Sequence, residues 1–480
     1  MPLVVHFTAC LTACHIALPP NRYLLQTYII IEKTMDLTKG KISSIYFKYL
    51  AAAFGSCMIS SIYGMVDTAM VGHYHGPEGS AAMAIVAPIW NIVYSLGLLT
   101  GIGGSVLLGT ERGKKTGREN QYFTVAFFGT LIISVICWIV MLLFDEQLLI
   151  FFGADSEILP YAMQYTTAVK YGVPLFLFSQ ALSAFLRNDG DPQRGTVAVI
   201  CSGIFNVAAD YIFIFVLDMG AFGAGLGTTL GAVINVGVMA THFLSKKNTL
   251  RFVKPVQIMK KFRQTVVTGF PSFFVDVAMG ILTIFFNRQI ARYLGNDALA
   301  VYGIIANVST LIQCCAYSVG QSAQPLFSVN LGAGHYDRVK KVCRYGLYAA
   351  AVFGVFWTVL LTAIPNGIIR LFMNATDSVL TIAPTIIRYY AISFLLLPFN
   401  IFSTYYFQSL LKPFTSFAVS VARGMVVSGI LIYVLPLILP TASIWFAMPI
   451  TELIVAIAAI ILMVKYTREL GQPTKNPPVM

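Results

Sequence analysis

Charged residues are scarce in this chain. They make up 11% of its 480 residues, whereas soluble domains carry roughly 25%, and hydrophobic residues reach 57%. The mean hydropathy is +0.76. This composition excludes an ordinary soluble domain and favours a polytopic membrane protein.

The eight cysteines have neither the spacing of a disulfide framework nor that of metal ligands. Cys314 and Cys315 are adjacent within an apolar stretch, and the others are scattered. The six histidines are equally dispersed. We therefore expect cysteines that pack as small apolar residues, and neither a metal site nor a catalytic site.

Twelve apolar stretches each reach the roughly 20 residues that a bilayer requires. We place them near residues 45–71, 83–109, 122–144, 160–187, 194–217, 222–245, 265–288, 299–328, 341–364, 382–411, 414–436 and 442–466. The expected fold class is an all-α polytopic membrane protein with twelve transmembrane helices.

The sequence repeats itself at an offset of about 219 to 221 residues. Gly113 matches Gly332 in a loop, and Asp191-Pro192 matches Lys412-Pro413 before an apolar stretch. Because each copy has six spans, both copies have the same orientation and are related by an axis along the membrane normal. Two pseudo-symmetric six-helix bundles of this kind are typical of transporters.

Five segments follow from this division: a doubtful extension at 1–34, the first bundle at 35–245, a linker at 246–264, the second bundle at 265–466 and a tail at 467–480. The extension lacks the pattern of a signal peptide. Met35 resembles an ordinary start, so we suspect that an upstream start codon was chosen. The basic linker suits two bundles that rock against each other, or simply helps to set orientation.

The net charge of +12 reflects topology rather than nucleic-acid binding. Most Lys and Arg lie in loops on one side of the predicted membrane, against only Arg288, Arg292 and Arg370 on the other. The positive-inside rule places the richer side in the cytoplasm. We therefore expect both termini in the cytoplasm and, in a bacterium, a location in the cytoplasmic membrane.

Acidic residues within the spans are the strongest functional candidates, because each is costly to insert in a bilayer. Asn206 and Asp210 are four residues apart and share one helix face. Depth along the helices, at about 1.5 Å per residue, lets Asp67 and Thr228 approach them. Such oxygens suit a hard cation, and a carboxylate also accepts a proton. The alternatives are that Asn206 and Asp210 only hydrogen-bond neighbouring helices, or that Lys170 pairs with one acid.

Two further charged residues lie at similar depths on consecutive spans. Arg423 and Glu452 are predicted to form a buried ion pair with a structural role, since removing either partner would strand a charge.

A substrate path is expected between the bundles. Aromatic side chains there would bind cationic aromatic compounds by cation–π contact, although most aromatic residues simply pack or face lipid. The aromatic candidates are Tyr63, Trp90, Tyr94, Tyr302 and Tyr317.

Several tracts together resemble the multidrug and toxic compound extrusion (MATE) family, and most of all its bacterial MepA-like branch. The tracts are Val66-Asp67-Thr68 with Gly72, Leu186 to Asp191, Asn206 with Asp210, Gly223 to Thr228, Gly332-Ala333-Gly334 and Ile444 to Ile450. Their order and spacing are specific, and the resemblance covers the chain from Met35 onward.

The resemblance implies an antiporter in which entry of Na+ or H+ drives export of amphipathic, often cationic compounds by alternating access. It maps the cation site to Asp67, Asn206, Asp210 and Thr228, with Gln180 as a weaker candidate. No cofactor other than the transported ion is implied. In the second half the pattern departs: Asp276 is an acid on the seventh span, but the tenth has no acid, only Asn400 and Gln408. Asp276 and Asn400 are therefore candidates for contact with substrate.

Two alternatives remain. A flippase for lipid-linked sugars in the same superfamily would share the repeat, but often has more helices and a strongly basic central cavity. An intramembrane prenyltransferase could use Asn206 with Asp210 as half of a metal-diphosphate motif, yet the sequence has no second aspartate-rich motif. The sequence leaves open the substrate, the coupling ion and the oligomeric state.

Overall fold

The computed structural model describes residues 37–372 and 376–472. Within these residues, 12 helical segments are long and apolar enough to cross a membrane, and there is no strand. The expected fold class is thus confirmed. The doubtful extension at 1–34 lies outside the described residues.

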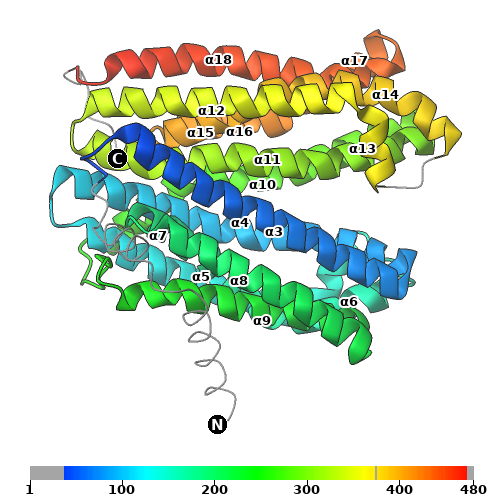
Figure 1. Cartoon of the computed structure of the whole chain (residues 1–480), viewed down its shortest axis with the longest axis horizontal. Helices are drawn as coiled ribbons and strands as arrows, with labels where there is room; N and C mark the ends of the chain where they lie inside the picture. Colours follow the sequence, from blue (N-terminus) through cyan, green and yellow to red (C-terminus); the bar gives the residue numbers. More distant parts are fainter. Residues whose placement is uncertain (1–36, 373–375, 473–480) are drawn as a thin grey trace, which may run out of the picture. The chain divides into compact units, whose positions relative to one another are not determined.

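The first half contains seven α-helices that build six spans (Figure 1). They are α3 (Ile42–His75), α4 (Pro77–Lys114), α5 (Glu119–Phe151), α6 (Leu159–Val169), α7 (Val173–Asn188), α8 (Pro192–Asp210) and α9 (Gly220–Ala240). The 3-10 turn Lys170–Gly172 joins α6 to α7 as one span. The π-helical turn Tyr211–Val216 extends α8, and the 3-10 turn Thr241–Leu244 extends α9.

The second half builds its six spans from α10 onward. Its helices are α10 (Ile258–Tyr293), α11 (Gly295–Gly332), α12 (Tyr336–Ala363), α13 (Pro365–Phe372), α14 (Asp377–Ala391), α15 (Leu397–Ser409), α16 (Pro413–Val421), α17 (Val427–Ile438) and α18 (Ala447–Glu469). The turns Ile392–Leu395, Ala422–Val426 and Thr441–Phe446 join α14 to α15, α16 to α17, and α17 to α18. The short α13 lies beside α14.

The repeat seen in the sequence is also a repeat of backbone geometry. Asp191 precedes α8 with φ −122° and ψ 57°, and Lys412 precedes α16 with φ −112° and ψ 59°. Proline begins each helix, where its missing N–H costs nothing and its ring keeps the preceding residue out of helical conformation. Each of these spans also contains a π-helical turn. The fifth and eleventh spans therefore follow matching paths.

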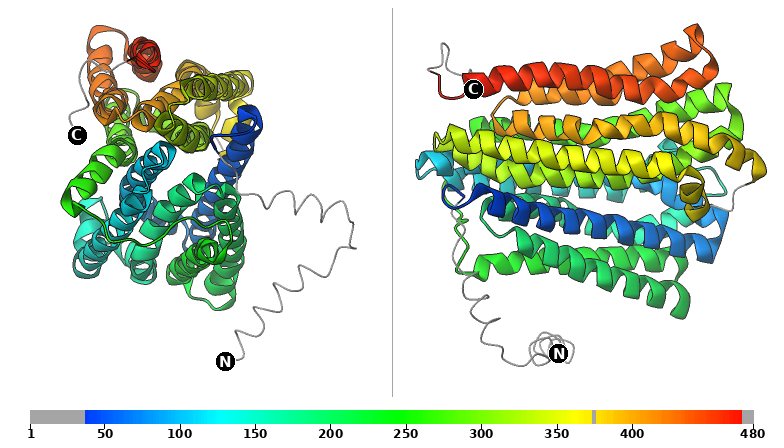
Figure 2. Two further views of the ribbon diagram at one scale, coloured as in Figure 1. Left: turned by 90° about the vertical axis from the view of Figure 1, so that its left-hand side faces the viewer. Right: turned by 45° about the horizontal axis from the view of Figure 1, so that its top comes forward.

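The halves contact each other chiefly through α4 with α10 and through α11 with α3 and α4. Figure 2 shows the helices end-on, with the first half in blue to green and the second in light green to red. A Cβ on Gly269 would lie 1.8 Å from the Leu99 carbonyl oxygen, and one on Gly332 would lie 2.0 Å from that of Thr110. Only glycine permits backbones to approach this closely.

These close contacts lie toward one side of the spans, where Lys114, Pro192 and Gly332 mark helix ends. Because most Lys and Arg gather there, we call it the basic side. Toward the opposite side, a Cβ on Gly64, Gly280 or Gly303 would meet nothing within 4 Å. The halves are thus tightly packed at the basic side and have open space beside these glycines farther along.

The linker packs against the first half. Thr249 donates from its backbone N–H to Asp189 Oδ2 over 2.9 Å, and Asn120 Nδ2 donates to the Thr249 carbonyl over 3.2 Å. Helix α10 begins at Ile258 rather than at the expected 265. The linker is consequently shorter than predicted, because the basic residues Lys260, Lys261 and Arg263 continue the helix beyond its apolar part.

Candidate functional site

Four helices of the first half bring the predicted cation-site residues together. Asp67 comes from α3, Asn206 and Asp210 from α8, and Thr228 from α9. The i, i+4 spacing on α8 directs Asn206 and Asp210 to one face, as expected. Asp67, Asn206 and Asp210 are all buried.

Hydrogen bonds connect these side chains into one cluster. Asn206 Nδ2 lies 3.3 Å from Asp210 Oδ1 and 3.4 Å from the hydroxyl of Thr228. Thr228 in turn donates to Asp67 Oδ2 over 3.4 Å. The two carboxylates are therefore joined through one amide and one hydroxyl. We call Asp67, Asn206, Asp210 and Thr228, with Tyr165, the polar cluster.

Tyr165 on α6 was not predicted. Its hydroxyl donates to Asp67 Oδ2 over 3.2 Å. As one of 24 tyrosines it carries no distinctive spacing. Its depth would have been the usable signal, because it lies about two helical turns into the fourth span from the same side as Thr228.

Three oxygens of the polar cluster remain uncommitted. Asp67 Oδ1, Asn206 Oδ1 and Asp210 Oδ2 are buried and accept no hydrogen bond from any described residue. Lys170 is engaged elsewhere, since its ammonium lies 2.7 Å from Asp145. Buried oxygens normally have partners. This set offers the hard oxygen ligands that a small cation requires, or a carboxylate for a proton.

A large cavity adjoins the polar cluster. Its empty space amounts to about 1280 Å³, including the part open to solvent. Asn206 and Thr228 line it, as does Gln180, whose side chain makes no hydrogen bond to the cluster. We call this space the first cavity. Its position lets a bound molecule lie directly beside the predicted cation site.

The predicted substrate residues divide into two groups. Tyr63, Tyr94, Asp276 and Tyr317 line the first cavity. Trp90, Tyr302 and Asn400 do not line a cavity. Trp90 packs on Phe176 at 5.5 Å between ring centroids.

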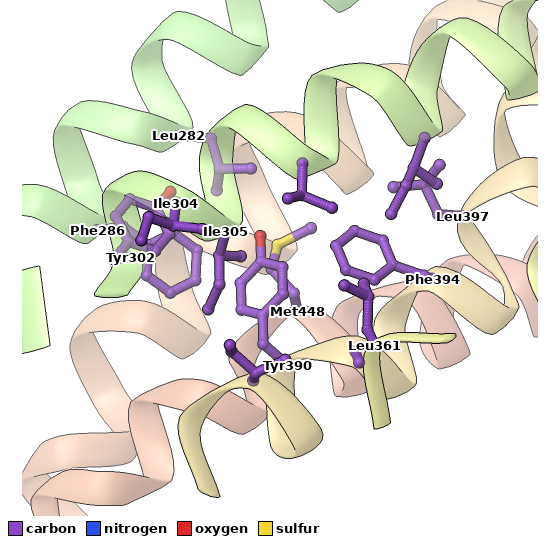
Figure 3. Packing of buried hydrophobic residues seen from close by; sticks show 14 of the residues in the cluster. Leu282, Phe286, Tyr302, Ile304, Ile305, Leu361, Tyr390, Phe394, Leu397 and Met448 are labelled. Carbon is purple, nitrogen blue, oxygen red and sulfur yellow. The ribbon is translucent and has the colours of Figure 1, made fainter. Parts of the chain in front are cut away.

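Tyr302 is held in the core of the second half. It stacks on Phe286, with ring centroids 4.9 Å apart, inside the cluster drawn in Figure 3. It is only 3% exposed. Its side chain thus packs in the core and does not reach the substrate path.

A family comparison agrees with this architecture. The MatE family model matches residues 52–212 and 258–435. The chain belongs to the MatE family. This is the MATE family expected from the sequence motifs, and the two matched segments correspond to the two halves.

Relatives of this MatE protein carry export names. Multidrug export protein MepA of Staphylococcus saprophyticus is 24% identical over 413 residues, covering 85% of this chain and 90% of the relative. Multidrug export protein MepA of Staphylococcus haemolyticus is 26% identical over 392 residues, covering 81% and 86%. The MepA-like branch is thus confirmed as a similarity.

Solved structures share the fold. A MOP superfamily transporter from Pyrococcus furiosus superposes with a TM-score of 0.86 at 19% identity, covering 92% of this chain and 99% of that one. A structure described as an outward-facing multidrug resistance MATE family transporter gives 0.84 at 19% identity, with the same coverage. At this identity the likeness establishes the fold alone.

The ion pair predicted in the second half of this MatE protein is present. Arg423 Nε lies 2.8 Å from Glu452 Oε1, and both residues are buried. Asn400 donates to Glu452 Oε2 over 2.6 Å and to its carbonyl oxygen over 2.9 Å. Asn400 therefore supports the ion pair and does not lie on the substrate path, because its amide is committed to Glu452.

A second charged cluster lies at the basic side. Both ring nitrogens of His242 face carboxylates, 2.8 Å from Asp189 and 3.1 Å from Asp191. Arg112 reaches Asp189 and Arg194 reaches Asp191, each over 2.9 Å. Burial alone would raise the pKa of Asp189. Hydrogen bonds from His242 and Thr249 and the charge of Arg112 outweigh burial, so its pKa lies below the usual value.

Proposed function

We propose that this MatE protein is a cation-coupled antiporter. It exports amphipathic, often cationic drugs across the cytoplasmic membrane in exchange for H+ or Na+. The observation that carries the coupling is the set of three uncommitted oxygens in the polar cluster, on Asp67, Asn206 and Asp210. A buried site that holds two carboxylates without a base beside them favours the entry of a positive charge.

The drug class is supported by the first cavity and by the relatives. The MepA relatives are named for multidrug export. The cavity combines the Asp276 carboxylate with the rings of Tyr63, Tyr94 and Tyr317. A carboxylate among aromatic faces is complementary to an organic cation with an apolar body.

The arrangement of the halves supports alternating access. Backbone contacts at Gly269 and Gly332 close the basic side, whereas space remains beside Gly64, Gly280 and Gly303. With the basic side in the cytoplasm, this conformation faces outward. The inward-facing state requires the glycine contacts to separate while the halves rock against each other.

The polar cluster and the first cavity share residues, and this sharing couples the ion to the drug. Asn206 and Thr228 hydrogen-bond within the cluster and also line the cavity. A cation that enters from outside neutralises the carboxylates and reorganises these two side chains. Release of a positively charged drug then becomes favourable, because the two charges compete for one negative site.

The test uses everted membrane vesicles from a strain without its own efflux pumps. Uptake of a fluorescent organic cation is measured under separate Na+ and H+ gradients, for wild type and for Asp210→Asn. Glu146→Gln is the matched control, because it removes an exposed carboxylate outside the polar cluster. We expect wild type and Glu146→Gln to accumulate the dye with one ion, and Asp210→Asn to lose at least about 90% of that rate, a tenfold effect.

Two results would contradict the proposal. Equal uptake by Asp210→Asn and Glu146→Gln would remove the polar cluster from coupling. No uptake by wild type under either gradient would remove drug export itself and favour a flippase for lipid-linked sugars.

A further inference from the structure

The second half contains a smaller cavity of its own. It lies between α10, α11, α15 and α16, with about 460 Å³ of empty space. Leu98, Ile401 and Tyr405 supply apolar wall, and Arg423 and Asp276 are the two charged residues that line it. We call it the second cavity. Nothing in the proposed coupling reaction uses its Arg423.

Arg423 turns only one edge of its guanidinium toward Glu452. Its Nε makes the 2.8 Å contact, and Asn400 satisfies the other Glu452 oxygen. No described residue accepts a hydrogen bond from the two terminal nitrogens of Arg423. Glu452 does not line the cavity. The cavity therefore meets guanidinium N–H donors, while the balancing carboxylate lies behind them.

The local backbone presents this guanidinium to the cavity. Arg423 lies in the π-helical turn Ala422–Val426. Turns of this kind interrupt α-helices frequently at functional sites. The next residue, Gly424, lets the turn approach α10, since a Cβ there would lie 2.5 Å from that of Ala278. The close approach brings Arg423 to the helix that carries Asp276.

Asp276 presents the opposite charge from another wall. Tyr317 donates to its Oδ1 over 3.1 Å, and its Oδ2 accepts no hydrogen bond from a described residue. Asp276 and Arg423 form no ion pair with each other, although both line the second cavity. Asp276 and Tyr317 also line the first cavity. Asp276 thus belongs to both spaces, whereas Arg423 belongs to the second alone.

We propose that the second cavity is a subsite for the carboxylate of a zwitterionic aromatic substrate. The ammonium group of the substrate lies at Asp276, its ring lies against Tyr317 and Tyr405, and its carboxylate accepts hydrogen bonds from the terminal nitrogens of Arg423. A guanidinium matches a carboxylate through two parallel N–H donors. This inference rests on the proposed export function and narrows its substrates from cations to include zwitterions.

The test measures binding to the purified full chain in detergent micelles by fluorescence titration. Three probes share one ring system: 6-(aminomethyl)-2-naphthoic acid as zwitterion, its methyl ester as cation, and 6-methyl-2-naphthoic acid as anion. We expect the zwitterion to bind wild type at least about tenfold more tightly than either other probe, because charge-assisted hydrogen bonds form at both ends.

Variants locate the effect. Arg423→Lys keeps a charge for Glu452 but removes the fork of donors, and should weaken the zwitterion at least about tenfold while changing the ester less than about twofold. Asp276→Asn should weaken both. Arg388→Lys is the matched control, because Arg388 is exposed and far from both cavities in its contacts. Should Arg423→Lys fold poorly, Arg423→Gln with Glu452→Gln removes the charges together and tests the same loss.

The outcomes separate the subsite from export. Zwitterion binding no tighter than that of the ester, or equal weakening of both by Arg423→Lys, would overturn the subsite even if the ester is transported. The expected binding pattern without transport of the ester in everted vesicles would support the subsite and refute the proposed export.

Discussion

The two halves bury acidic side chains in different ways. In the first, Asp67 and Asp210 are joined by Asn206 and Thr228, and each carboxylate keeps one oxygen without a partner among the described residues. In the second, Glu452 has both oxygens engaged, by Arg423 and Asn400. The repeat thus preserves the path of the helices but not their charge balance. The first half keeps oxygens uncommitted for a cation, and the second commits its acid to the fold.

The strongest test of this comparison removes the base of the second half. Arg423→Ala leaves Glu452 buried without its counter-charge, so we expect the free energy of unfolding to fall by about 3–5 kcal/mol. Unfolding by SDS in dodecyl maltoside micelles measures it. The double variant Arg423→Met with Glu452→Leu should recover most of the loss. A single variant as stable as the double would show that the pair is not structurally important.

A second test compares two amides at matching places in the repeat. Asn400 donates to Glu452, whereas Gln180, 220 residues earlier at the repeat spacing, faces the first cavity. Asn400→Ala should cost about 1–3 kcal/mol of stability, because Glu452 loses a donor. Gln180→Ala should change stability by less than about 0.5 kcal/mol. The same unfolding assay decides, and equal losses would erase the difference between the halves.

The third test removes an acid of the first half. Asp210→Asn strands no base, and the new amide oxygen can still accept from Asn206. We therefore expect stability to change by less than about 1 kcal/mol or to rise, since a neutral amide is less costly to bury than a carboxylate. Thermal unfolding followed by fluorescence measures it beside the transport assay. A loss of several kcal/mol would mean that the polar cluster is structural.

The sequence predicted features that depend on depth and helical spacing. Asp210 follows Asn206 by one turn, and Arg423 and Glu452 lie at similar depths on consecutive spans; the structure brings each set together. Rotation of a span about its own axis was not predictable. Trp90 and Tyr302 lie on helices that are apolar all round, where a ring facing the core and a ring facing a cavity look the same in sequence.

Contacts of connecting segments were equally hidden. Thr249 reaches Asp189 from the linker, although nothing in its sequence marks it as a partner. Its place depends on how the linker folds back along α5, which only the assembled bundle determines. The rocking function suggested by its basic charge stays a prediction.

The smallest expected effect concerns the basic-side cluster, where acids and bases are balanced and the first half behaves as the second half does. The pKa values of Asp189 and Asp191 are lowered, because bonds from His242 and the nearby arginines outweigh burial. A lowered folded-state pKa stabilises the fold above the unfolded value, about 3.9, and this contribution is lost as the pH falls through the folded value. The midpoint of thermal unfolding of wild type should therefore drop below about pH 4 more steeply than that of Asp189→Asn. Asp155→Asn, an exposed acid in a turn, is the control and should follow wild type. Parallel acid limbs for wild type and Asp189→Asn would show that this cluster contributes nothing to the pH dependence, and would confine charge-balanced stabilisation to the second half.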